Sequence, residues 1–252
     1  MKLSVLMPAY NSAAYIEAAL QSLLRQREAV AMEIIVVNDG STDGTGDILR
    51  GMARRFDEIK LIETKNGGVT RARNIALRHV ATDSDLISFL DSDDLSPPGR
   101  FERDIQFFRS DLNLDLVYST MRLFETMDEI QLAPKENTEI LDVRGIHLGA
   151  GLYRTSFIRS LGGFDEGFEQ AEDTDFLLRI LESLPTYQLS DEIGYFYRKH
   201  ETSLTQNKSV VAREFSRALL KSAKRRKALG PDFQMPQGFF DITAFIHARK
   251  WT

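Results

Sequence analysis

The feature that most constrains this fold is a repeated pattern of short apolar runs, each ended by a polar cluster and followed by helical spacing. The run Glu33–Val37 is almost continuously apolar, which is typical of a strand buried on both faces of a parallel sheet. Similar runs occur at Leu3–Met7, Lys60–Glu63 and Leu86–Leu90. Helical spacing follows from Ser12, from Thr42 or Asp43 to Arg55, and over residues 69–80. This alternation predicts right-handed βαβ units in an α/β, doubly wound and mostly parallel sheet with helices on both faces.

The second half of the chain has a less regular pattern. Strands are expected at residues 116–119, 122–124 and 195–198, and the segment 128–142 is expected to be polar and exposed. A helix is expected to begin at Glu172, and a basic helix is expected from Val210 to Leu229.

Composition limits the class of protein. With 252 residues, 42% of them hydrophobic and 27% charged, the chain is long enough for one large soluble domain, with or without an appended segment. The absence of cysteine excludes disulfides, thiolate metal sites and a cysteine nucleophile, and it fits a reducing compartment. The N-terminal apolar run is too short for a signal peptide, and no apolar stretch reaches about 18 residues. The expected location is therefore the cytoplasm.

The net charge of −5 is unevenly distributed. Residues 1–197 carry 20 Lys and Arg against 33 Asp and Glu, whereas residues 198–252 carry 12 against 4. The acidic body argues against a nucleic-acid groove. The basic C-terminal helix is expected either to make a peripheral contact with an anionic membrane, at its inner face, or to be a solvated surface. Phe239-Phe240 and Phe245-Ile246 are expected to extend that surface or to form a contact between copies of a homo-oligomer.

Three polar clusters follow the predicted strands, and they are expected to converge. They are Pro8-Ala9-Tyr10-Asn11, Asn38-Asp39-Gly40 and Asp91-Ser92-Asp93-Asp94. In open α/β sheets, ligands bind outside the carboxyl ends of the strands. The sequence therefore predicts one binding site at that edge, with Asp39 placed to accept a hydrogen bond from a base or a sugar.

The crowded carboxylates after the fourth strand need an explanation, because adjacent negative charges repel unless a cation offsets them. Mg²⁺ and Mn²⁺ prefer oxygen ligands, so an Asp-x-Asp at a strand end is suited to a metal and a diphosphate; the alternative is a solvated turn. The segment Asn66–Asn74 carries two glycines and two arginines where a helix is expected to begin. Such a segment can bind an anionic ligand or can be a plain loop. The presence of the other polar clusters favours the anionic ligand.

Several segments together resemble the family 2 glycosyltransferases, which are inverting enzymes with the Rossmann-like GT-A fold. The segments that carry the resemblance are "SVLMPAYNSAAYIEAALQSLLRQ", "EIIVVNDGSTDGT", "NGGVTRARNIAL", "ISFLDSDD", "GGFDEGFEQAEDTDFLLRI" and "YFYRKHETSLT". They occur in this order, so the resemblance covers about residues 1–205. It implies a nucleotide-binding half over about 1–95 and an acceptor half over about 96–205, followed by a basic helical extension at 206–252.

The resemblance also implies the roles of individual residues. Asp93 is the expected direct metal ligand, with Asp91 nearer the ribose or the metal and His200 as a further ligand, and the expected cofactor is Mn²⁺ or Mg²⁺. The residues expected to bind the nucleotide-sugar are Pro8, Ala9, Tyr10, Asn11, Asp39, Arg73, Asp91, Ser92, Asp94 and Arg198. Within this set, Asp39 is expected to contact the base and Arg198 to neutralise phosphate. The other histidines receive no role.

The Glu172-Asp173 pair at a predicted helix start resembles the catalytic Glu-Asp motif of the same family. Inversion needs one carboxylate to deprotonate the acceptor hydroxyl, while a metal stabilises the departing diphosphate. Asp173 is the expected base, and Glu172 is expected to orient hydroxyl groups. The alternative is that both carboxylates only favour the helix dipole.

The predicted function is therefore a metal-dependent inverting transfer of a sugar, most simply from a UDP-sugar, to a glycan or lipid-linked acceptor in polysaccharide or glycolipid assembly. One alternative is a nucleotidyltransferase that makes sugar nucleotides, which needs a glycine-rich basic loop after the first strand; Pro8–Asn11 lacks both features. Another is a phosphatase with an aspartyl nucleophile, whose Asp-x-Asp follows the first strand and not the fourth. A third is a catalytically inactive glycan-binding module. The sequence names neither the sugar nor the acceptor.

Overall fold

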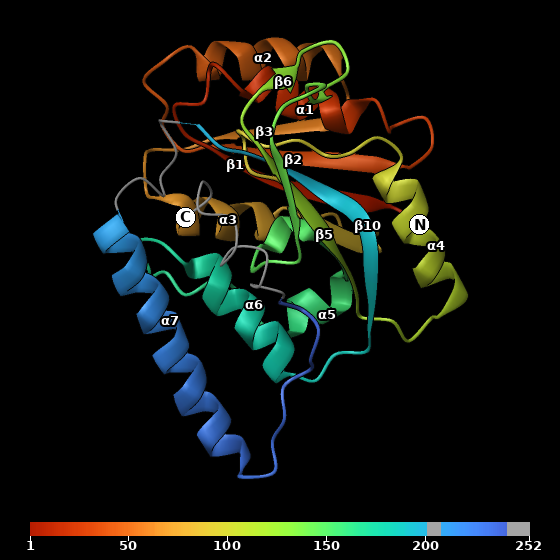
Figure 1. Ribbon diagram of the computed structural model, residues 1–252. Coiled ribbons are helices and arrows are strands. Elements are labelled where there is room, and N and C mark those ends of the chain that lie inside the picture. The colour runs from red at the N-terminus through yellow and green to blue at the C-terminus, as the bar shows by residue number, and fades with distance from the viewer. Residues whose placement is uncertain (201–207, 241–252) are drawn as a thin grey trace.

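One mixed sheet organises the protein, in a computed structural model that describes residues 1–200 and 208–240. The strand order is β10-β5-β9-β4-β1-β2-β3 (Figure 1). Its first half is parallel and follows the predicted runs: β1 (Leu3–Ala9), β2 (Met32–Asn38), β3 (Ile59–Glu63) and β4 (Leu86–Phe89). Every residue of β1, β2 and β4 is buried, which explains why these strands read as near-continuous apolar runs.

The strands from the second half of the chain include antiparallel pairs, and their number and bounds differ from the prediction. β5 (Leu116–Phe124) is a single strand where two were expected, because residues 119–121 continue the pairing without a turn. β9 (Gly151–Arg154) was not predicted; it lies antiparallel between β4 and β5. β10 (Tyr187–Arg198) is parallel to β5 and begins eight residues before the predicted strand. Since most pairs remain parallel, the predicted sheet class is confirmed.

The segment 128–142 was expected to be polar and exposed, and Ile140 near its end is 46% exposed, but the strands in this segment were not predicted. β6 (Met127–Asp128) and β7 (Ala133–Pro134) form a separate two-stranded sheet, and Ile130 between them is 90% exposed. β8 (Ile140–Val143) then returns to the main sheet and pairs antiparallel with β5. A strand with one exposed face alternates polar and apolar side chains, and over four residues that pattern is too short to recognise.

Helices cover both faces of the sheet, as predicted. α1 (Ile16–Leu24) and α2 (Thr45–Arg55) lie on the upper face in Figure 1, and α3 (Val69–Arg78), α5 (Thr155–Ser160) and α6 (Glu172–Glu182) lie on the lower one. α4 (Arg100–Ser110) contacts β10 and was not predicted, although its buried Phe101, Ile105 and Phe108 have the i, i+4, i+7 spacing of an amphipathic helix. A short 3₁₀ helix, Leu148–Ala150, precedes β9.

The C-terminal segment lies against the body of the protein. α7 (Lys208–Leu229) packs along the outer side of α6, away from the sheet (Figure 1). Farther along the chain, Phe239 is 1% exposed, with its ring 5.4 Å from that of Tyr118 and 4.6 Å from that of Tyr187. The proposed boundary near residue 205 stays a prediction, and Phe245-Ile246 lies outside the described residues. Within those residues, no helix has the length and apolar character needed to cross a membrane.

Candidate active site

The register of the parallel strands brings the first two polar clusters together. Ala9 pairs with Asn38, so the backbone N–H of Asp39 donates to the Ala9 carbonyl at 2.9 Å. Asn11 has a left-handed φ of 48°, and its Oδ1 accepts a hydrogen bond from the backbone N–H of Thr42 at 2.8 Å. Tyr10 stands beside them 47% exposed, at the edge where a flat ring can contact a ligand. Pro8, at the end of β1, is buried.

Asp39 holds the glycine loop that precedes α3. Its carboxylate accepts hydrogen bonds from the backbone N–H of Gly67 at 2.9 Å and of Gly68 at 2.8 Å, and from the Thr64 hydroxyl at 3.2 Å. Gly68 has a φ of +88°, which a residue with a Cβ rarely adopts. The carboxylate therefore fixes the start of the helix that carries Arg73. Contact between Asp39 and a nucleotide base stays a prediction.

Arg73 joins the acidic turn to the Glu-Asp pair. Its guanidinium is buried, and it donates to Asp91 Oδ1 at 2.7 Å through one nitrogen and to Glu172 Oε1 through another. Burial alone would lower the pKa of Arg73, but the charges of Asp91 and Glu172 outweigh it and hold that pKa above the ordinary value. Two predicted motifs, more than 80 residues apart in the chain, are thus connected by one permanently charged group.

The acidic turn contains two carboxylates in different electrostatic states. Burial would raise the pKa of Asp91, but Arg73 and His147 hold it below its ordinary value, so Asp91 is ionised. Asp94 is 3% exposed, and burial, followed by the charges of Asp93 and Asp91, raises its pKa well above the usual range. Asp94 accepts hydrogen bonds from the Tyr195 hydroxyl and from the backbone N–H of Arg198, both at 2.7 Å. Asp94 therefore connects the acidic turn to β10.

Asp93 and His200, both predicted as metal ligands, face each other. The His200 Nε2 lies 2.9 Å from Asp93 Oδ2, and the His200 ring lies 4.4 Å from that of Tyr15. Arg198 is buried beside them, with its guanidinium 5.2 Å from the Tyr15 ring centre and 3.0 Å from the Met127 sulfur. Ser92, the middle residue of the Asp-x-Asp, is also buried.

His147 belongs to this site, although no role was predicted for it. Its Nε2 lies 3.6 Å from Asp91 Oδ2, its ring lies 4.4 Å from that of Tyr195, and its Nδ1 accepts a hydrogen bond from the Gly149 backbone N–H at 3.1 Å. Burial lowers the pKa of His147 in spite of the charges of Asp91 and Asp173. No motif surrounds this histidine in the sequence. It reaches the site because it lies between β8 and β9, neither of which was predicted.

The donor atoms at this edge suit a hard divalent cation. Asp91, Asp94 and His147 offer ligand atoms within 4.8 Å of one another, and Asp93 with His200 forms a second pair. Carboxylate oxygens with an imidazole are ligands that Mn²⁺ accepts and that Mg²⁺ accepts in part. Asp94 is the least suited of the three carboxylates, since both its oxygens already accept hydrogen bonds. Asp91, Asp94 and His147 nevertheless form the group of described residues whose spacing suits a metal ion, and the predicted Asp93–His200 pair lies outside that group.

The predicted catalytic pair, Glu172 and Asp173, begins α6 after an unusual backbone conformation. The residue before it, Ala171, has a φ of 60° and a ψ of 19°, a left-handed conformation that is rare without glycine. Glu172 is buried, and burial, aided by the charge of Asp173 and opposed by Arg73, raises its pKa to about 7. Asp173 Oδ1 accepts the backbone N–H of Thr174 at 2.6 Å, which orients its carboxylate. Asp173, but not Glu172, lines a small pocket that is too tight for a water molecule; its other lining residues are Arg73, Phe89, Asp91, His147, Leu148, Gly149 and Tyr195.

The floor of this pocket depends on α4. Arg100, which is fully buried, donates to the carbonyls of Gly149 at 2.7 Å and Gly151 at 3.0 Å. A Cβ at Gly149 would meet the Tyr195 ring at 2.1 Å, and one at Gly151 would meet the Tyr153 hydroxyl at 2.1 Å. These glycines are therefore required by the rings packed beneath them.

The raised pKa of Glu172 predicts a pH-dependent part of the stability. Because the folded value of about 7 lies above the ordinary 4.5, the folded state binds the Glu172 proton more tightly than the unfolded chain does. The free energy of unfolding should therefore fall as the pH rises between these two values, by on the order of 1 to 3 kcal/mol for this group.

Urea unfolding across that window compares the wild type with Glu172→Gln, which should lose this part of the decline. Asp94, whose pKa is also raised, contributes to the slope of both proteins, so the difference reports on Glu172. Identical slopes would contradict the raised pKa.

Comparison with known proteins identifies the family. Residues 4–159 match the model of glycosyl transferase family 2, so the chain belongs to this family and is a glycosyltransferase. It is 33% identical over 219 residues to the uncharacterized glycosyltransferase EpsJ of Bacillus subtilis, which covers 81% of this chain and 62% of EpsJ. It is 29% identical over 224 residues to the poly(ribitol-phosphate) beta-N-acetylglucosaminyltransferase TarS of Staphylococcus aureus, over 85% of this chain and 39% of TarS. The chain thus spans less than two thirds of these curated relatives.

Solved structures share the architecture. S. aureus TarS 1-349 in complex with UDP-GlcNAc has a TM-score of 0.74 at 23% identity, covering 93% of this chain and 68% of that chain. The mannosyltransferase PcManGT from Pyrobaculum calidifontis, in complex with GDP-Man and Mn²⁺, has a TM-score of 0.68 at 20% identity, over 98% and 70%. At these identities the likeness concerns the fold, and the predicted GT-A architecture is confirmed.

Proposed function

We propose that this glycosyltransferase is metal-dependent and inverting, and that it moves a sugar from a nucleotide-diphosphate donor to an acceptor hydroxyl. The observation that carries the proposal is the Arg73 bridge, which connects the ionised Asp91 of the acidic turn to Glu172 of the α6 pair. The acidic turn, proposed for a metal-bound diphosphate, and the α6 pair, proposed to supply the base, both contact this one guanidinium, which keeps them close enough for an in-line displacement.

Asp173 is the proposed base. Asp173 Oδ1 accepts a hydrogen bond from the Thr174 N–H. Among the residues that the structure describes, none donates to Oδ2, so this oxygen is proposed to face the acceptor hydroxyl. Oδ2 takes the hydroxyl proton as the acceptor oxygen forms a bond to the anomeric carbon. The bond from that carbon to the diphosphate oxygen breaks, and its electron pair leaves with the nucleoside diphosphate. Attack from the side opposite the leaving group inverts the anomeric configuration.

The remaining residues hold the donor. Arg73 supplies positive charge beside the pocket, Arg198 does so beside Asp93, and Tyr10 offers an exposed ring at the strand edge. Asp91 and Asp93, with His200, are proposed to hold Mn²⁺ or Mg²⁺, with His147 next to Asp91. When bound, the ion would stabilise the negative charge of the departing diphosphate. The presence of Mn²⁺ in the PcManGT structure supports this assignment.

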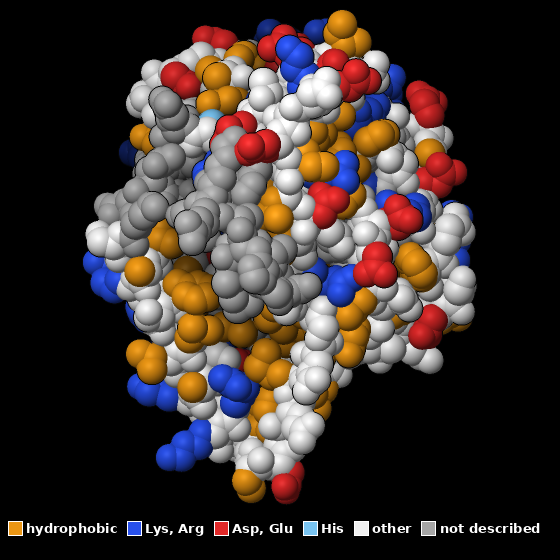
Figure 2. Space-filling view, in the orientation of Figure 1, with side chains coloured by type: hydrophobic (Ala, Val, Ile, Leu, Met, Phe, Trp, Pro, Cys, Tyr) orange, Lys and Arg blue, Asp and Glu red, His pale blue; other side chains and the backbone are white. Residues whose placement is uncertain are grey.

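The donor is proposed to be a UDP-sugar and the acceptor a glycan or lipid-linked chain in polysaccharide assembly. The UDP-GlcNAc bound to TarS and the poly(ribitol-phosphate) in that relative's name support both parts. The proposed location is the cytoplasm, with a contact at the inner membrane face. On α7, Phe215, Leu219, Leu220 and Leu229 remain exposed, and Lys and Arg side chains gather over this helix at the lower left of Figure 2.

Thermal unfolding with a panel of UDP- and GDP-sugars tests the donor class. A ligand that binds only the folded state raises its stability, by about 2.7 kcal/mol at a concentration of about 100 Kd. One UDP-sugar should raise the midpoint in the presence of Mn²⁺ and lose that effect when EDTA is added. Stabilisation by a donor that is never cleaved would favour an inactive binding module, and no stabilisation by any donor would contradict the proposal.

A further inference from the structure

The first turn of α6, which carries the catalytic pair, is held from two sides. On one side Arg73 of α3 contacts Glu172. On the other, Asp175 is 1% exposed and accepts hydrogen bonds from Arg225 of α7 at 2.8 Å and from Arg179 at 3.2 Å. Because Asp173 lies between Glu172 and Asp175, its orientation follows from these two attachments.

The backbone conformation of Ala171, just before α6, needs to be held by contacts such as those of Arg73 and Arg225. The left-handed Ala171 immediately before the turn is less favourable than a right-handed conformation, because its Cβ crowds the following carbonyl. Such conformations persist only where the surrounding structure holds them. The buried Asp175 carboxylate is charge-paired with two guanidinium groups, of which only Arg225 comes from outside α6. Arg225 is thus the tie between this turn and a second helix.

Arg225 also contacts Glu182 at the C-terminal end of α6. Its Nη2 lies 3.2 Å from Glu182 Oε1, and its Nε contacts the other oxygen of that carboxylate. One side chain therefore bridges the first and last turns of α6, which restrains both the rotation and the position of the helix. Nearby, Lys221 pairs with Asp165, and Arg217 donates to the Gly167 carbonyl at 2.7 Å, so that the loop leading to α6 is held by α7 as well.

We propose that α7 is a positioning element for the transfer reaction, with Arg225 acting through Asp175 as a positioning residue for the base. α7 lies beyond the segment, residues 4–159, that the family model matches. Its basic character, which the sequence left open between a membrane contact and a solvated surface, is then explained in part by ion pairs within the protein. This inference rests on the proposed function of Asp173 as the base.

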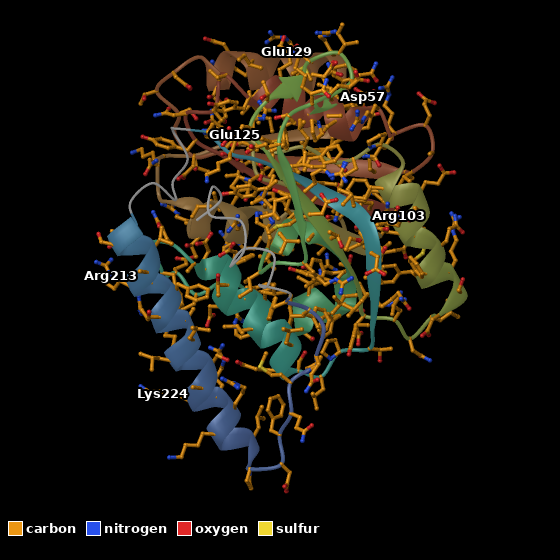
Figure 3. All side chains as sticks on the ribbon, viewed as in Figure 1. Asp57, Arg103, Glu125, Glu129, Arg213 and Lys224 are labelled. Atoms are coloured by element: carbon orange, nitrogen blue, oxygen red, sulfur yellow. The ribbon has the colours of Figure 1, made fainter. Side chains whose placement is uncertain are left out.

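Arg225→Ala tests the inference in the full chain. The loss of the α7 tie should lower kcat by about 10- to 100-fold, as expected when a base is displaced by about an ångström. KM for the donor should stay near the wild-type value, since the proposed donor-binding residues lie at the ends of β1, β2, β4 and β10 and on α3, and none lies on α6 or α7. Lys224→Ala is the control on the same helix (Figure 3): Lys224 is exposed, none of the ion pairs found among the described residues involves it, and kcat should be unchanged.

Chemical rescue separates positioning from a general loss of stability. An open pocket of about 430 Å³ reaches the ion pair and is lined by Gly163, Asp165, Asp175, Arg179, Lys221, Lys224 and Arg225. Guanidinium ion in the millimolar range should enter the space left by Arg225→Ala and restore part of kcat, whereas sodium chloride at the same concentration should not. If the alanine variant does not fold, Arg225→Lys replaces it, and a lower kcat at unchanged KM is expected. Wild-type kcat in a folded Arg225 variant would overturn the inference.

Hydrogen exchange distinguishes failure of this inference from failure of the proposed function. The Asp175 backbone N–H donates to the Ala171 carbonyl at 3.0 Å and closes the first turn of α6. Its exchange should accelerate in Arg225→Ala and not in Lys224→Ala, whether or not a donor is known. A wild type without transfer activity would overturn the proposed function alone. Equal exchange in the two variants would overturn the positioning role.

Discussion

Asp173→Asn should abolish sugar transfer and leave donor binding intact. The amide that replaces the carboxylate cannot accept the proton of the acceptor hydroxyl, and general base catalysis contributes about 10²–10⁴-fold to a rate. The fold should tolerate the change, because Asp173 is partly exposed at the start of α6 and the amide keeps an oxygen that accepts the Thr174 N–H. We therefore expect kcat to fall by at least about 100-fold, while the Kd of the donor in the presence of Mn²⁺ changes little.

The measurement is the release of nucleoside diphosphate under single-turnover conditions, together with donor binding by calorimetry. Asp47→Asn, an exposed carboxylate in the first turn of α2, is the matched control and should behave as the wild type. Full transfer by Asp173→Asn would move the base elsewhere. Loss of donor binding in that variant would assign Asp173 to the donor instead.

Asp93→Ala should remove the metal-dependent part of donor binding. Asp93 is the carboxylate of the acidic turn that faces His200 at 2.9 Å, and it is only partly buried. Loss of a group that merely supports a metal ligand costs 10- to 100-fold in metal affinity, so loss of a ligand should cost at least about 10-fold. The expected result is weak UDP binding that no longer responds to Mn²⁺.

Titration of UDP in the presence and absence of Mn²⁺ measures this effect. The control is Asp83→Ala, an exposed carboxylate that precedes β4 at the opposite end of that strand and pairs with Lys2. UDP affinity that stays Mn²⁺-dependent in Asp93→Ala would place the metal on Asp91 and His147 instead of on Asp93 and His200.

The parallel half of the fold could be predicted from the sequence because buried strands such as Glu33–Val37 and helices such as α3 leave strong local patterns. The same patterns place Asp39 and Asp91 at one edge, since parallel strands end together. α4 was missed although Phe101, Ile105 and Phe108 have the spacing of an amphipathic helix, whereas β9 has only four residues and leaves no period to recognise. Short signals of this kind are resolved only by tertiary contacts.

The part of the site that could not be predicted comes from the same weakly patterned half. His147 reaches Asp91 because β5, β8 and β9 pair as they do, which no spacing in the sequence indicates. The left-handed Ala171 carries no glycine to signal it. In the sequence, Arg225 does not differ from the other Lys and Arg residues of its basic helix, and only the structure shows its contacts with Asp175 and Glu182.

The anomeric configuration of the product tests the central claim most directly. Wild-type protein, the UDP-sugar selected by thermal unfolding and a glycan acceptor can be followed by NMR, with Mn²⁺ and then with EDTA. The account predicts UDP release with Mn²⁺ only, and a product whose anomeric configuration is opposite to that of the donor. A product that retains the donor configuration, or transfer that persists undiminished in EDTA, would contradict it.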